Sequence, residues 1–180
     1  MKVLHVGEYV QGGVATYILT LIDHPNHPEI EDYLVCSDNN SDHSWKLPAG
    51  RIYYYPYKRT LGNIPNAIKA IYRVVKHVKP DVIYCHSTWA GLFVRLPLFF
   101  LPKHYRIIYN AHGWAFLRDT TSLNKALYAL IERVLSIRTD AIVNVSDYEY
   151  RATKNAGISK KRLRLVFSGI SFCKGRNATC

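Results

Sequence analysis

The chain has 180 residues, of which 48% are apolar, and its 24 Lys+Arg against 13 Asp+Glu give a formal net charge of +11. Enough apolar surface is available for a core, which excludes an intrinsically disordered chain, and the length favours a single domain. Most of the excess positive charge lies in residues 91–180. An anionic partner would meet that half of the chain, although a charge that serves solubility alone is an equally good interpretation.

The first predicted elements alternate between strand and helix. Residues 2–9 contain the apolar run of a buried strand, and residues 14–22 have the spacing of a helix. Strands are next predicted at 32–37 and 51–57. Pro56 cannot donate a ladder hydrogen bond, so the second of these strands is expected to end there or to lie at an edge of the sheet.

The middle of the chain contains the clearest helical pattern. Residues 64–78 carry apolar side chains at three- and four-residue steps, and Pro80 stops the helix. A strand is predicted at 81–86, followed by a helix from 89 towards Pro97 and a strand at 106–111.

The last third begins with a second amphipathic helix, predicted at 125–136. Its apolar side chains are expected on one buried face: Ala126, Leu127, Leu130, Ile131, Val134 and Leu135. A strand at 140–146, a helix at 147–156 and a strand at 164–167 complete the series. This alternation predicts an α/β fold with a doubly wound, mostly parallel sheet that helices cover on both faces.

Ligands of such sheets bind at the carboxyl ends of the strands. Gly12 and Gly13 lie between the first strand and the first helix, where free helical N–H groups suit a phosphate, although a tight turn without a ligand is equally compatible. His86 and His112 each end an apolar strand. Histidine can hold or transfer a proton near neutral pH, which makes both of them candidates for chemistry.

Metal and disulfide chemistry are not indicated. The chain has four cysteines, Cys36, Cys85, Cys173 and Cys180. They form no CxxC pair, so neither a disulfide framework nor a zinc site is predicted, and a reducing cytoplasm fits best. His24 and His27 lie near Glu29, but a solvated loop is a better interpretation than a metal site.

Nucleic acid and a membrane are the other anionic partners to consider. Lys160, Lys161 and Arg162 form a basic run without interleaved aromatic residues, which favours a solvated turn over a nucleic-acid patch. No signal peptide is predicted, and the most apolar segment, 92–101, is too short to span a bilayer. That segment is either a buried helix end or, with Arg95 and other basic residues beside it, a membrane contact.

Four segments together resemble the N-terminal half of a GT-B glycosyltransferase of the retaining family 4 type. They are MKVLHVGEYVQGGVATYILTL, KPDVIYCHSTWAG, IIYNAHGW and TDAIVNVSDYEYRATKNAGISKKRLRLVFSGI. The family has the same order of a strand, glycine pair and helix, a DVIHxH-like strand, a TxHG-like strand and a closing segment. The resemblance implies a Rossmann-like GT-B N-terminal domain over residues 1–170.

The resemblance also implies roles for single residues. Gly12 and Gly13 match the glycine pair that lies against the phosphates of the nucleotide-sugar donor. His112 matches the catalytic histidine beside the transferred sugar. The positions that match the acceptor side or the cleft are His86, Trp89, Trp114, Arg118 and Ser146. Family members need no bound metal for the chemistry, so no metal and no cofactor is expected.

Two departures from the family pattern shape the expected function. Ser168 replaces the asparagine of the closing segment, and residues 171–180 resemble neither a linker nor a strand of the second domain, so we expect the donor-binding domain to be absent from these 180 residues. We therefore expect an acceptor-side domain for the synthesis of a cell-surface polysaccharide or a lipid-linked glycan, weak or inactive alone. The alternative is a non-catalytic module that pairs with a separate donor-binding subunit. Either is expected in the cytoplasm or on the inner face of the membrane.

Overall fold

A computed structural model of the protein describes residues 1–23, 29–42 and 44–167. Its sheet contains strands β1 (Lys2–Gly7), β2 (Glu31–Ser37), β3 (Ile52–Tyr55), β4 (Val82–His86), β5 (Arg106–Asn110), β6 (Ala141–Asn144) and β7 (Leu163–Leu165). The spatial order is β3-β2-β1-β4-β5-β6-β7, and each neighbouring pair is parallel. The predicted doubly wound α/β sheet is confirmed, and β3, which precedes Pro56, lies at an edge as expected.

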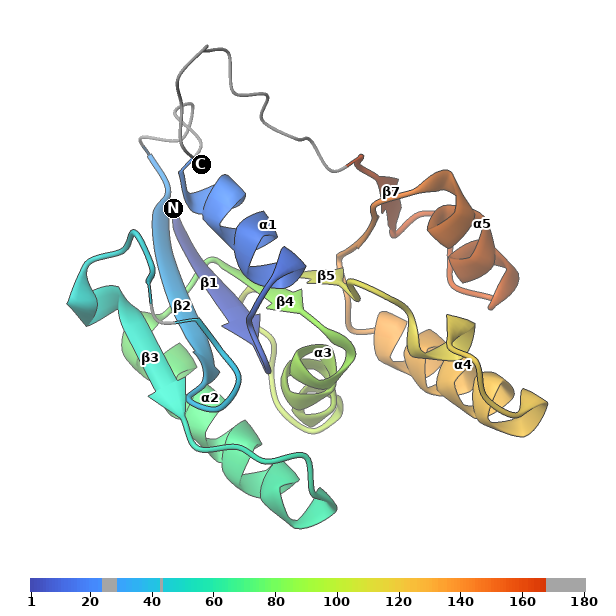
Figure 1. The fold of residues 1–180 in the computed structure, drawn as a ribbon, viewed down its shortest axis with the longest axis horizontal. Coiled ribbons are helices and arrows are strands. Elements are labelled where there is room, and N and C mark those ends of the chain that lie inside the picture. The colour runs from blue at the N-terminus through green and yellow to red at the C-terminus, as the bar shows by residue number, and fades with distance from the viewer. Residues whose placement is uncertain (24–28, 43, 168–180) are drawn as a thin grey trace.

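Helices connect the strands (Figure 1). They are α1 (Gly13–Ile22), α2 (Ile64–Val78), α3 (Thr88–Arg95), α4 (Ser122–Ser136) and α5 (Asp147–Asn155), with single turns η1 (Ala49–Arg51), η2 (Leu61–Asn63), η3 (Pro97–Phe99) and η4 (Ala115–Leu117). The bounds of the predicted elements agree with these within a few residues. The predicted helix that starts at Trp89 ends before Pro97 and continues only as the turn η3.

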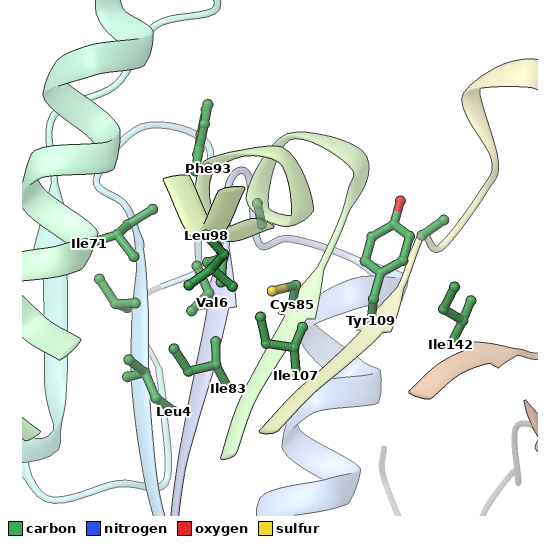
Figure 2. Close-up of a cluster of buried hydrophobic side chains, with 14 of the residues drawn as sticks. Leu4, Val6, Ile71, Ile83, Cys85, Phe93, Leu98, Ile107, Tyr109 and Ile142 are labelled. Carbon is green, nitrogen blue, oxygen red and sulfur yellow. The ribbon is translucent and has the colours of Figure 1, made fainter. Parts of the chain in front are cut away.

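The main core lies between the sheet and the helices α2 and α3. Figure 2 shows its centre, where side chains of β1, β4 and β5 meet those of the two helices, among them Val6, Ile83, Ile71 and Phe93. The opposite face of β1 and β2 is covered by α1, whose Ile18 is fully buried. Because the strands are parallel, their carboxyl ends all lie on one side of the molecule, which is where the topology places a ligand.

The buried face of α4 is not the predicted one. Of the six side chains expected inside, only Leu135 is buried, while Leu127 is 50% exposed and Leu130 56% exposed. The helix instead turns Glu132 into the core, where its carboxylate contacts the fully buried Arg95 of α3. A buried carboxylate is stable only with a partner, so the ion pair determines which face of α4 points inward.

Candidate functional site

A pocket of about 700 Å³ lies beside α1 at the carboxyl ends of β5 and β6. Gly13 and Tyr17 of α1 line one side, and His112 with Glu149 lines the other. A second hollow of about 470 Å³ shares His112 and Glu149 and extends to Arg118 and Ser146. The fold therefore brings residues together that lie more than a hundred positions apart in the sequence, at the edge of the sheet that parallel topology predicts.

The glycine pair leaves the end of the pocket at α1 open. Gly12 has a φ of +58°, a conformation that favours glycine, and it precedes α1 without a side-chain cap. A Cβ atom added to Gly13 would meet no other atom within 4 Å. The first N–H groups of α1 have no partners within the helix, so this end of the pocket is suited to an anionic group.

His112 lies at the centre of the two hollows, on a sharply turned backbone. Its φ is +48°, and its amide N–H donates to Oδ1 of Asn110 at 3.0 Å, which helps to stabilise the turn. The ring of Tyr17 packs edge-on against the imidazole at 4.7 Å between centroids. Burial lowers the pKa of His112 to about 4. The imidazole is therefore neutral at pH 7, with one nitrogen that donates a hydrogen bond and one that accepts.

His86 does not line either hollow, because it is fully buried behind His112. Its Nδ1 lies 3.2 Å from Nε2 of His112, and its Nε2 lies 2.9 Å from Nδ1 of His5. Burial, with His5 and His112 adding to it, holds the pKa of His86 well below its usual value. The predicted pair of strand-end histidines is in contact, but only His112 reaches the pocket.

The two tryptophans that were predicted to contact a ligand lie in different places relative to the hollows. Trp114 is 1% exposed and donates from Nε1 to Oδ1 of Asn144 at 3.2 Å, so it supports the floor of the second hollow. Trp89 packs on Phe93 of α3 as part of the core and lines neither hollow. Trp114 therefore lines the second hollow from a nearly buried position, whereas Trp89 lies outside both hollows.

Arg118 and Ser146 lie at the second hollow, as predicted. Arg118 is exposed there and carries a charge that an anionic or sugar ligand can approach. Ser146 is the N-cap of α5: its Oγ accepts from the amide of Glu149 at 3.2 Å, and the carboxylate of Glu149 accepts from the amide of Val145 at 3.1 Å. This reciprocal capping fixes Ser146 and Glu149 at the pocket wall.

Two residues of this region were not singled out from the sequence. His5 on β1 lies within an apolar run, where alternation would favour another core side chain. Glu8, which follows β1, is 1% exposed and accepts two hydrogen bonds from Arg59, at 2.6 and 2.9 Å. The only signal for either is a polar side chain in or beside a buried strand, which indicates a partner elsewhere in the fold without naming it.

The described ranges, 1–23, 29–42 and 44–167, contain no metal-binding cluster and no membrane-spanning helix. Within them, no cluster of three or more His, Cys, Asp and Glu side chains is arranged to hold a metal ion. His24 and His27 lie outside the described residues, as do Cys173 and Cys180. The long helices of residues 1–23, 29–42 and 44–167 include none that is apolar enough to cross a bilayer. Lys160 and Lys161 are exposed in the turn before β7, where a solvated turn was predicted, but Arg162 of the same run is half-buried and donates to the carbonyls of Thr139 and Ile137.

Residues 11–172 match the profile of Glycosyltransferase Family 4. This chain belongs to glycosyltransferase family 4. Among its relatives, a Klebsiella pneumoniae protein described as "Uncharacterized 41.2 kDa protein in cps region" is 34% identical over 95% of this chain and 47% of that protein. The O-antigen biosynthesis glycosyltransferase WbnH of Escherichia coli is 30% identical over 54% of this chain and 28% of that protein.

Solved structures agree with the family assignment at the level of the fold. The apo lipopolysaccharide outer core galactosyltransferase WaaB has a TM-score of 0.72 at 18% identity, over 97% of this chain and 47% of that one. HepE of Anabaena, solved in complex with UDP-glucose, has a TM-score of 0.68 at 15% identity, over 94% and 44%. The family 4 chain therefore has the fold of a GT-B N-terminal domain, and it spans about half the length, or less, of the proteins that it matches.

Proposed function

We propose that this chain is the acceptor-side half of a retaining glycosyltransferase, which transfers a sugar from a nucleotide-sugar to a glycan or a lipid-linked acceptor during synthesis of a cell-surface polysaccharide. One observation carries the proposal: Gly13 at the open end of α1 and the neutral His112 line one pocket at the carboxyl ends of the strands. The names of the Klebsiella and Escherichia relatives support a role in the synthesis of a cell-surface polysaccharide.

Each part of the pocket has a proposed role. Gly12 and Gly13 let the donor diphosphate approach the N-terminus of α1, which stabilises negative charge on the leaving group without a metal ion or other cofactor. His112 lies beside the transferred sugar and hydrogen-bonds to it. Arg118 and Ser146, in the adjoining hollow, face the acceptor. His86 supports His112 from behind and Trp114 forms part of the wall of the second hollow, whereas Trp89 contributes only to the packing of α3.

Full activity is proposed to need a donor-binding domain, either in the same longer protein or in a separate subunit. A family 4 site holds the donor between two domains, and orientation from both sides is needed to stabilise the leaving diphosphate. Residues 1–180 alone are therefore expected to turn over slowly. If they turn over a UDP- or GDP-sugar at an ordinary enzymatic rate, this part of the proposal is wrong. A chain that restores transfer only with a second polypeptide supports the split arrangement.

Replacing Gly13 with valine is expected to weaken binding of the nucleotide-sugar by at least about tenfold, which is about 1.4 kcal/mol. A Cβ atom at this position has nothing from the rest of the protein within 4 Å, and Gly13 lines the pocket, so the valine side chain is expected to occupy the space of the phosphates. Calorimetry on the protein with its donor-binding domain measures the effect.

Gly50→Val provides the matched control, since its Cβ also meets nothing within 4 Å and it lies in η1, away from the pocket. If Gly13→Val and the parent protein bind the nucleotide-sugar with equal affinity, the glycine pair is not part of the donor site. If the parent protein releases no nucleoside diphosphate from any sugar nucleotide tested, glycosyl transfer itself is the wrong reaction.

We further propose that the protein docks on an anionic membrane surface, on the cytoplasmic side, through the exposed apolar side chains of α4 and η3. This α4–η3 surface consists of Leu123, Leu127, Leu130, Ile131, Val134, Phe99, Phe100 and Leu101. The turn η3 lies near the C-terminal end of α4, since the guanidinium of Arg138, two residues beyond α4, lies 5.8 Å from the ring of Phe99. Lys125 and Arg133 on α4 supply positive charge, and each basic residue near an anionic bilayer contributes about 1 kcal/mol. The buried Arg95 takes no part, contrary to the sequence-based expectation.

The double variant Leu127→Asp/Leu130→Asp is expected to reduce co-sedimentation with phosphatidylglycerol vesicles by at least about tenfold, because it places two carboxylates in the apolar surface. Tyr148→Asp, on the exposed side of α5, is the control and should bind like the parent protein. If the parent protein binds neutral phosphatidylcholine vesicles as strongly as phosphatidylglycerol vesicles, the basic residues do not contribute to membrane binding. If the parent protein binds neither kind of vesicle, the membrane proposal is wrong.

A further inference from the structure

Four polar side chains form a hydrogen-bonded line across four neighbouring strands. Oδ1 of Asp32 on β2 lies 3.1 Å from Nε2 of His5 on β1, and Nδ1 of His5 lies 2.9 Å from Nε2 of His86 on β4. Nδ1 of His86 lies 3.2 Å from Nε2 of His112, which follows β5. Since β2, β1, β4 and β5 are adjacent in the sheet, the line crosses the strands and ends in the pocket.

The interior of this line is closed to water. His5 is 2% exposed and His86 is fully buried, while the side chain of Asp32 is 15% exposed. The rings of Tyr17 from α1 and Tyr84 from β4 pack against it, and their hydroxyls lie 2.9 Å apart. These two phenols and the carboxyl of Asp32 contact the histidines directly, and Glu149 of α5 lines the same two hollows as His112.

The carboxylate of Asp32 sets the direction of every bond in the line. A carboxylate only accepts hydrogen bonds, so Nε2 of His5 must carry a hydrogen, which leaves Nδ1 of a neutral His5 as an acceptor. His86 then donates from Nε2, and its own Nδ1 accepts from Nε2 of His112. The second nitrogen of His112, Nδ1, has no hydrogen-bond partner among residues 1–23, 29–42 and 44–167, and it is left with a free lone pair.

We propose that Asp32, His5 and His86 are positioning residues that act through His112. They present Nδ1 of His112 as an acceptor for a hydroxyl group of the substrate, and they carry a proton received there to His5, beside Asp32. That the hydroxyl belongs to a sugar rests on the proposed function. The direction of the hydrogen bonds and the path of the proton do not.

The proton transfer balances at each step. A proton binds Nδ1 of His112, and the hydrogen on its Nε2 passes to Nδ1 of His86. The hydrogen on Nε2 of His86 then passes to Nδ1 of His5. One proton has been taken up, His86 and His112 have both exchanged tautomers, and the positive charge lies on His5, 3.1 Å from the carboxylate of Asp32. The charge is thereby stabilised by an ion pair and does not remain on the two buried rings, where desolvation opposes it.

Nitrogen-15 NMR of the histidine side chains tests this without substrate, because it distinguishes the two neutral tautomers from the cation. In residues 1–180, as pH falls, His5 is expected to become cationic while His86 and His112 change from the Nε2–H to the Nδ1–H tautomer, all at one midpoint. Separate midpoints, or a His112 that becomes cationic while His5 stays neutral, would overturn the relay.

Two variants separate the relay from simple packing. Asp32→Asn keeps the shape and one acceptor but removes the charge, so the common midpoint is expected to fall by about one pH unit or more. Glu31→Gln, on the same strand but bonded to Tyr33, should leave the midpoint unchanged. His5→Gln can bond to both neighbours but cannot hold the proton, so the tautomer change at His112 is expected to disappear. If it persists, or if Asp32→Asn leaves the midpoint in place, the proposal fails, whatever the outcome of the glycosyl-transfer assay.

Discussion

Replacing His112 with alanine is expected to lower the turnover of the protein with its donor-binding domain by about 10² to 10⁴-fold. That is the range for loss of a side chain that holds or moves a proton at a reacting centre. The imidazole is central to both hollows, and its neutral form offers one acceptor and one donor at pH 7. Release of nucleoside diphosphate under saturating donor and acceptor measures the change in kcat.

The control for this variant is His104→Ala, since His104 is exposed and lies outside both hollows. The His112→Ala chain should keep its far-ultraviolet spectrum, because the ring lies at the pocket wall and contributes little to the core. A folded His112→Ala enzyme with the turnover of the parent would contradict the catalytic assignment. A chain that fails to fold is tested with His112→Asn, which keeps a polar group of similar reach.

Replacing Glu132 with alanine is expected to lower the free energy of unfolding by about 3–5 kcal/mol, the largest stability effect of any substitution considered. Oε2 of Glu132 lies 2.9 Å from Nη2 of Arg95, and its Oε1 accepts from the hydroxyl of Tyr109 at 2.7 Å. Arg95 also lies over the ring of Tyr109 at 3.7 Å and donates to the carbonyl of Gly91. Removal of the carboxylate leaves a buried guanidinium without its counter-charge.

Urea denaturation of residues 1–180 measures this loss. Glu31→Ala is the control, because its contact with Arg51 at 4.0 Å is exposed and contributes at most about 1 kcal/mol. The double variant Arg95→Met/Glu132→Leu removes both charges and should recover most of the stability, since apolar side chains of similar volume replace buried ion pairs at little cost. A double variant as unstable as Glu132→Ala would show that the pair is not the source of the effect.

The strands and their parallel arrangement were accessible from the sequence because short apolar runs alternate with amphipathic helices, and parallel topology then fixes where ligands bind. Gly13 and His112 were found by that rule, and the structure brings them to one pocket. Trp89 and Trp114 were expected there by resemblance; Trp114 lines the second hollow, whereas Trp89 packs against the core outside both hollows. Position along a strand predicts the end of the sheet at which a residue lies, but not whether its side chain faces the ligand.

The face of α4 could not be predicted because periodicity counts apolar residues and places charged ones in solvent. Glu132 is buried because Arg95, on a different helix, provides its partner, and this contact has no signature in either segment alone. His5 was missed for the same reason, since its partners Asp32 and His86 lie on other strands. Polar contacts between residues on distant elements leave no pattern in either segment, so they could not be predicted from the sequence of this chain.

The central place of β1 in the sheet also bears on how the chain emerges from the ribosome. Its pairing with β2 can form early, but its other neighbour, β4, follows much later, and the contacting residues His5 and His86 are 81 positions apart. At ordinary translation rates that interval lasts on the order of ten seconds, with one edge of β1 open to other chains. The contact between His5 and His86 would therefore mark the moment at which β1 of a nascent chain has strands paired on both of its edges.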